Sequence, residues 1–203
     1  MKIYDISQEI FSCAVYPGDT APSFVAVSRI ESGSLCNLSD VNMSVHNGTH
    51  IDAPYHFIAD GKTVDAIPLE KTVGRCIVAE LEGRMTADDV KRIVCSTDDR
   101  EAAKRVLIKG DAVVTAEAAR GFVEAGVCLV GIESQSFGEI DAPMEAHKIL
   151  LAEEIVLLEG IRLSSVKAGS YLLSAAPLKL GGLDGAPVRA LLIDLNDLET
   201  KDY

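Results

Sequence analysis

Residues 41–52 alternate between apolar and polar side chains, and this alternation constrains the fold more than any other feature of the sequence. Apolar side chains occupy positions 41, 43, 45 and 51, whereas the even positions hold polar residues or glycine. A period of two is typical of a half-buried β-strand, whose alternate side chains point to the same face. The pattern predicts a strand over Asn42–His50 and places His46, His50 and Asp52 on one polar face.

A helix would also bring His46 and His50 to one face, as in metalloproteases with the HExxH motif. On a helix, however, Asp52 would point well away from His46. Asn47 and the glycine that follows it are also poor helix formers. We therefore reject the helical metalloprotease motif and retain the strand.

Histidines are few in this chain and clustered. Only four occur, and His46, His50 and His56 lie within eleven positions of one another. Two imidazoles and a carboxylate on one face are a ligand set for zinc or a similar divalent ion, and Gly48 is expected to keep the space at the ion open. Pro54 ends regular strand pairing, so we expect His56 to fold back near the same patch. The alternative is a pair of surface histidines on an exposed edge strand. That alternative would suit an isolated HxxxH spacing, but it explains the full string from His46 to His56 less well.

Composition and charge narrow the class of protein. With 203 residues, 48% hydrophobic and 25% charged, the chain is expected to form one domain over residues 1–203. Its net charge of −12 disfavours nucleic acid and anionic membranes as partners. No apolar run reaches the roughly 18 residues of a membrane span, and the N-terminal residues contain no signal segment. Five scattered cysteines without a CxxC pair are expected to be small core residues in a reducing compartment. The N-terminal residues, the lack of a long apolar run and these cysteines together predict a cytoplasmic protein.

Short β-type runs alternate with helical patterns, with no internal repeat or long linker. The expected strands are Phe24–Ile30, Asn42–His50, Cys76–Glu80, Arg105–Ile108, Val127–Ile132, Ile155–Leu158, Gly169–Leu173 and Val188–Asp194. Thr86 and Thr115 are the predicted N-caps of two helices, the second of which covers Ala116–Ala125. Because strands outnumber helices, we predict a mixed α/β domain built around a sheet or a partly closed barrel.

Residues 46–57, with the string HNGTHIDAPYHF, resemble the signature of the cyclase family of metal-dependent hydrolases, which includes bacterial kynurenine formamidase and isatin hydrolase. Other segments also match the family pattern, in the same order along the chain. They are Tyr16–Thr20, Ala59–Gly61, Ala146 with His147, Glu159, and Gly185–Ala190. The resemblance implies a swivelling β/β/α domain, sheet-dominated and partly barrel-like. It also implies a homodimer or homotetramer whose chains each hold two divalent metal ions. Zinc is the first candidate for these ions, and manganese is the second.

The resemblance also implies a role for each histidine. His46, His50 and Asp52 would bind one ion, and Asp52 would reach the second as well. His147 would bind the second ion, Glu159 would bridge the two, and His56 would be the acid/base group.

The spacing between His147 and Glu159 can be tested by geometry. Twelve residues of helix span about 18 Å, whereas paired metal ions lie only about 3.5 to 4 Å apart. The helical stretch Glu145–Glu153 must therefore end, and a short strand over Ile155–Leu158 is expected to return Glu159 to the site.

Substrate recognition is where the chain departs from the family pattern. Tyr16 stands where the formamidases place a tryptophan against an aromatic substrate, and a phenol can still stack on a planar ring. The alternative is a loop tyrosine that packs beside Pro17. Loops such as 15–20 often complete the pocket of a neighbouring subunit in the family, so Tyr16 is expected to act across an interface. The stretch 108–115 is shorter than the family's usual loop, and Gly138 replaces its usual aspartate.

The chemistry expected of such a site is amide hydrolysis. A divalent ion lowers the pKa of bound water from about 15.7 toward 7, which supplies hydroxide to attack an amide carbonyl. His56 could carry a proton from the water to the leaving nitrogen. An aryl formamide such as N-formylkynurenine is the first candidate substrate, and a cyclic imide or lactam is the alternative. A metal-holding protein without turnover is the second class, although such a protein has no use for His56.

Overall fold

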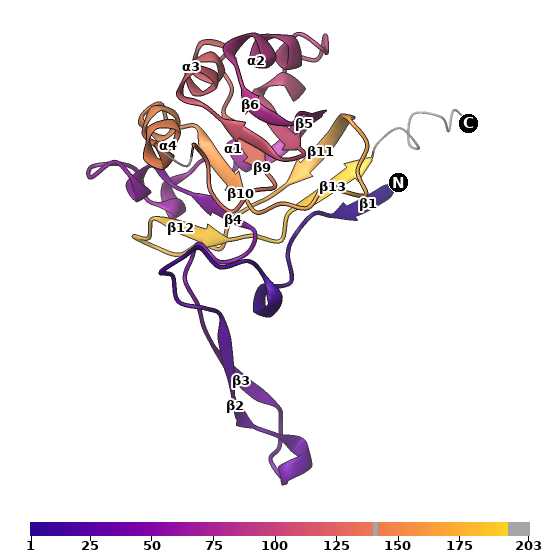
Figure 1. Ribbon diagram of the computed structural model, residues 1–203. Coiled ribbons are helices and arrows are strands. Elements are labelled where there is room, and N and C mark those ends of the chain that lie inside the picture. Colours follow the sequence, from indigo (N-terminus) through magenta and orange to yellow (C-terminus); the bar gives the residue numbers. More distant parts are fainter. Residues whose placement is uncertain (140–141, 195–203) are drawn as a thin grey trace.

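The computed structural model describes residues 1–139 and 142–194, so the last nine residues of the expected domain 1–203 lie outside the described part. Nine strands form one curled mixed sheet in the order β1-β13-β11-β5-β7-β9-β10-β4-β12 (Figure 1). They are β1 (Lys2–Asp5), β4 (His50–Asp52), β5 (Val73–Glu80), β7 (Arg105–Lys109), β9 (Leu129–Ile132), β10 (Val156–Glu159), β11 (Gly169–Ser174), β12 (Gly185–Pro187) and β13 (Leu191–Asp194). Neighbours among β5, β7, β9 and β10 are parallel, and the other pairs are antiparallel. The predicted fold class, a sheet-dominated and partly barrel-like α/β domain, is confirmed.

The α-helices of the described residues are α1 (Leu69–Thr72), α2 (Ala87–Val94), α3 (Ala116–Glu124) and α4 (Pro143–Ala152). Both predicted N-caps are present. Thr86 accepts a hydrogen bond from the backbone of Asp89, whose side chain accepts one from the backbone of Thr86 in return, and Thr115 accepts one from Ala118. Among the described residues, no helix is long and apolar enough to cross a membrane.

The sheet separates two apolar layers. Along β7, Leu107 packs into one layer, and its neighbours Val106 and Ile108 pack into the other, as the two-residue period of a strand requires. The second layer lies against α2, α3 and α4, which follow one side of the sheet (Figure 1). Leu157 of β10 belongs to this helix-covered layer.

A hairpin of β2 (Ser23–Ser28) and β3 (Leu38–Asn42) projects from the body as an arm (Figure 1). We call residues 23–42 the arm. At its base the ring of Phe24 lies 5.1 Å from that of Phe11. A second small pair, β6 (Gly83–Met85) and β8 (Ala112–Val114), is parallel.

The strand predicted over Asn42–His50 is wrong. Strand β3 ends at Asn42, β4 begins only at His50, and turns and bends fill most of the stretch between them. Asn47 closes this turn, because its backbone N–H donates to the Ser44 carbonyl and its side-chain oxygen accepts the Ser44 N–H. Gly48 has a left-handed φ of 64°, which interrupts the alternation.

Other predicted elements lie within a few residues of the observed ones, although the strand expected from Val188 begins at Leu191. The strands β1, β6, β8 and β12 were not predicted. The prediction of core cysteines holds for Cys76, which is buried, but is wrong for Cys36 and Cys95, which are exposed. Cys36 lies on the arm, and Cys95 follows the last residue of α2.

Candidate metal centre

The pairing of β4 with β10 builds the floor of the site. In this antiparallel register His50 lies opposite Glu159, and Asp52 lies opposite Leu157. Because opposite residues share a face, all three polar side chains lie on the helix-covered side of the sheet, where Leu157 packs. The Nε2 atom of His50 is 3.2 Å from Glu159 Oε2 and 3.4 Å from Asp52 Oδ1.

Helix α4 contributes His147, whose Nε2 atom lies 3.1 Å from Glu159 Oε1. The helix ends at Ala152, Glu154 takes a left-handed φ of 55°, and β10 begins at Val156. The predicted break between His147 and Glu159 is therefore confirmed.

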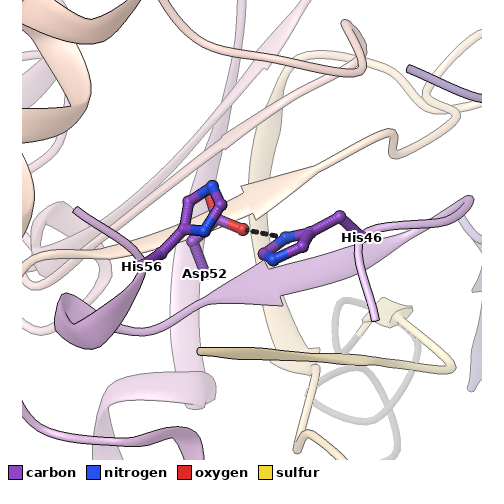
Figure 2. Close-up of side chains that lie close together, drawn as sticks. All are labelled: His46, Asp52 and His56. Carbon is purple, nitrogen blue, oxygen red and sulfur yellow. Dashed lines mark hydrogen bonds and ion pairs between the residues drawn. The ribbon is translucent and has the colours of Figure 1, made fainter. Parts of the chain in front are cut away.

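The turn before β4 presents His46 to the same carboxylate. Its Nδ1 atom lies 2.8 Å from Asp52 Oδ1 (Figure 2), and its Nε2 atom lies 2.7 Å from Asp184 Oδ2. Gly185 permits this position, since a Cβ there would lie 2.8 Å from His46 Cε1. His46 and Asp52 thus meet as predicted, but through a turn and not through one continuous strand.

His56 returns to the site as predicted from Pro54. It ends the 3₁₀ turn η3 (Pro54–His56), and Figure 2 shows its ring beside Asp52 and His46. The ring centroids of His56 and His46 are 4.1 Å apart, and His56 Nδ1 lies 3.2 Å from Asp184 Oδ2.

Gly48 has a different role from the one predicted. The atoms nearest to a Cβ at this position belong to Ile10 and Cys13, the first at 3.1 Å. Glycine is therefore needed for the left-handed backbone and for this packing, and not for space at an ion. The Nε2 atom of Gln135 donates to the carbonyls of Gly48 and His46, which holds the turn in place.

The buried carboxylates dominate the electrostatics of the site. Burial lowers the pKa of His50, but hydrogen bonds with Asp52 and Glu159 outweigh burial and raise it to about 10. Burial raises the pKa of Asp52, but hydrogen bonds with His46 and His50 hold it well below its ordinary value. Asp52 and Glu159 therefore stabilise a positive charge on the buried imidazole of His50.

His56 behaves differently. Burial lowers the pKa of its imidazole, and the nearby charges of Asp52 and Asp184 compensate only in part. The ring is therefore neutral at pH 7 and able to accept a proton.

The residues fit a divalent metal centre. Their imidazole nitrogens and carboxylate oxygens are ligands that zinc and manganese accept. Among the described residues no hydrogen-bond donor reaches the buried Oδ2 of Asp52, which leaves that oxygen available to a cation. Ligand atoms of His46, Asp52 and His56 lie within 4.8 Å of one another, as do those of His50, Asp52 and Glu159.

A cavity of about 340 Å³ opens above these side chains, which is the size of a small-molecule site. Its walls include Tyr16, Phe57 and Met144, with Gln135 and Ser136 beside them. Tyr16 is 45% exposed and lines the cavity of its own chain.

Asp184 and Gln135 are site residues that the sequence reasoning did not identify. Asp184 lies in the string KLGGLDG, which indicates a turn and carries no ligand spacing. Asp184 does directly precede Gly185, the first residue of a segment that matches the family pattern. This proximity is the one feature of the sequence that could have identified Asp184 as a site residue.

Known proteins resemble the chain in sequence. The family model Cyclase, described as "Putative cyclase", matches residues 4–139. The kynurenine formamidase of Salinibacter ruber (strain DSM 13855 / M31) is 37% identical over 213 residues, which cover 97% of this chain and all of that protein.

Solved structures resemble it in fold. A potential metal-dependent hydrolase with cyclase activity has a TM-score of 0.80 at 31% identity, with 94% of this chain and 96% of that chain covered. An isatin hydrolase bound to the product analogue thioisatinate has a TM-score of 0.81 at 18% identity, with 94% and 91% covered. At that identity the isatin hydrolase supports the fold alone.

Proposed function

This chain belongs to the cyclase family, and from that premise we propose that it is a metal-dependent hydrolase of small amides that acts in the cytoplasm. An aryl formamide such as N-formylkynurenine is the first candidate substrate, because the 37% identical relative is named a kynurenine formamidase. The observation that carries the proposal is the buried convergence of Asp52, Glu159, His50 and His147 beneath the cavity.

Two divalent ions per chain are proposed, with zinc as the first candidate and manganese as the second. Their proposed ligands are His46, His50, Asp52, His147 and Glu159. The orientation of the carboxylates supports this sharing. Oδ1 of Asp52 faces His46 and His50, whereas Oδ2 is 3.7 Å from His147 Nε2. Glu159 likewise presents one oxygen to His50 and the other to His147. Five such side chains are too many for one tetrahedral ion.

His56 is the proposed acid/base group. Bound divalent ions lower the pKa of water toward 7 and polarise a carbonyl oxygen. The imidazole of His56, neutral and 28% exposed, accepts a proton from water and returns it to the leaving nitrogen. Tyr16 and Phe57 line the cavity where a planar substrate would be held, so Tyr16 is proposed to stack on it.

Metal analysis and a substrate panel test this function together. Protein saturated with zinc or manganese is expected to hold about two ions per chain by elemental analysis, and to hydrolyse aryl formamides. Cyclic imides and lactams such as isatin belong in the same panel as the alternative substrates. One ion or fewer would contradict the dinuclear centre, and two ions without turnover of any amide would favour the non-catalytic alternative.

The arm supports the proposed homodimer or homotetramer. A two-stranded hairpin is marginally stable by itself and needs a packing partner. This arm nevertheless exposes all of its large apolar side chains, namely Phe24, Val25, Val27, Ile30, Leu35, Leu38 and Val41. We propose that they pack against a second copy of the chain.

Sedimentation at micromolar concentration is expected to give a species of two or four chains of 21.6 kDa. The double variant Val25→Lys with Val27→Lys should sediment as a monomer, because lysines in an apolar interface lose hydration without gaining a partner. Leu178→Lys is the matched control, since Leu178 is exposed on the body and not on the arm. A monomeric parent, or an unchanged assembly in the double variant, contradicts the role of the arm.

A further inference from the structure

Asp184 contacts both the proposed metal ligand His46 and the proposed acid/base group His56. One of its oxygens, Oδ2, lies 2.7 Å from His46 Nε2 and 3.2 Å from His56 Nδ1. The two rings lie against each other, as Figure 2 shows. A single carboxylate oxygen therefore joins the metal centre to the group that moves the proton.

The chemistry of a carboxylate fixes the direction of both hydrogen bonds. An aspartate ionises near pH 3.9 in its ordinary state, and an ionised carboxylate only accepts hydrogen bonds. Nε2 of His46 and Nδ1 of His56 must then be the nitrogens that carry hydrogen and donate. By the same rule Nδ1 of His46 donates to Asp52 in the metal-free protein, and it must lose that proton when an ion is bound. In the neutral rings of the metal-loaded protein, the lone pairs are left on Nδ1 of His46 and on Nε2 of His56.

This tautomer suits each proposed role. Nδ1 of His46 lies 2.8 Å from Asp52 Oδ1, where its lone pair and a carboxylate can share a cation. Nε2 of His56 is left unprotonated and able to accept a proton. We propose that Asp184 is a positioning residue that fixes the tautomers of His46 and His56, an inference that rests on the proposed function.

The backbone of Asp184 is held independently of its side chain. Its carbonyl accepts the Ala53 N–H at 2.9 Å, and the next residue, Gly185, pairs with Asp52 in the sheet. The side chain itself is 36% exposed. Asp184→Ala is therefore expected to fold and to keep the loop in place.

Nitrogen NMR of protein labelled only at histidine tests the tautomers directly, because the chain has four histidines. In the zinc-loaded parent we expect His56 to be protonated at Nδ1, with its signal assigned by its absence in His56→Ala. In Asp184→Ala the proton should shift toward Nε2. An unchanged tautomer in Asp184→Ala overturns the proposal, whether or not the protein hydrolyses any amide.

Kinetics on the best substrate give a second measurement. Loss of a hydrogen-bond partner behind a metal-site histidine typically costs 10- to 100-fold, so Asp184→Ala should lower kcat by about that factor with little change in KM. Adding Asp184→Ala to His56→Ala should cost less than Asp184→Ala costs in the parent, because the part of the effect that passes through His56 is already lost and only the part through His46 remains. Full additivity would show that Asp184 does not act through His56.

Asp65→Ala is the matched control for the loop. Its carboxylate accepts the Gly182 N–H at 3.0 Å, two residues before Asp184, and contacts neither histidine. We expect Asp65→Ala to leave the tautomer of His56 unchanged. A tautomer change in this variant equal to that in Asp184→Ala would assign the effect to the loop and overturn the role of the carboxylate.

Discussion

His50→Ala is expected to lose metal and activity together. Its Nε2 atom faces both Glu159 and Asp52 in a place where all three side chains are buried. Without the imidazole, two carboxylates remain close together with one fewer ligand to hold an ion between them. Metal content after dialysis should fall well below that of the parent, and turnover should fall by about 10³-fold or more.

A folding control separates ligand loss from general destabilisation. Thr49 is as buried as its neighbour, and its hydroxyl donates to the Gly160 carbonyl and accepts the Gln8 N–H. Thr49→Val should therefore loosen the same segment without removing a ligand, and should keep its metal. If His50→Ala retains the metal and rate of the parent, His50 is not a ligand. An equal loss of metal in Thr49→Val would assign the loss to loosening of the segment and not to the missing imidazole.

The charge of His50 gives the same prediction a pH dependence. With a pKa of about 10, His50 carries a proton at pH 7 in the metal-free protein, and a ligating nitrogen must lose it. Zinc uptake at pH 7 should therefore release a proton from this site, which calorimetry in buffers of different ionisation enthalpy measures. Apparent zinc affinity should fall as the pH is lowered below 10, and His50→Ala should lack this contribution.

The histidine cluster shows what could be predicted from local sequence. Two imidazoles and a carboxylate close together in sequence predicted a ligand set, and His46, His50 and Asp52 do meet. The predicted strand through His46 was nevertheless wrong, because Asn47 and Gly48 form a turn that the alternation did not reveal. Proximity in sequence predicted the composition of the site better than its backbone.

Residues distant in sequence were harder to predict. Without the family resemblance Glu159 would be one acid among many, and it meets His50 only through the pairing of β10 with β4. Asp184 is 128 positions from His56 and reaches the site because β12 pairs with β4. Such contacts depend on strand order, which neither composition nor local periodicity specifies.

His56→Ala should keep the metal of the parent and lower kcat by roughly 10²- to 10⁴-fold, the usual contribution of general acid–base catalysis. His56 is placed by η3 after the sheet strand has ended, and its Nδ1 atom faces Asp184. The proposed ligands His50 and His147 face the buried carboxylates instead. Loss of His56 therefore removes proton transfer and leaves the five proposed ligands in place.

Metal content decides the role of His56, because the structure also puts a ligand atom of this residue within 4.8 Å of those of His46 and Asp52. Each variant is measured for bound metal and for turnover of the best substrate, with His50→Ala as the reference for ligand loss. If His56→Ala loses its metal as His50→Ala does, His56 is a ligand and the acid/base assignment is wrong. If it keeps both metal and full rate, the proton travels through another group, and Glu159 is the next candidate because its carboxylate also lines the cavity.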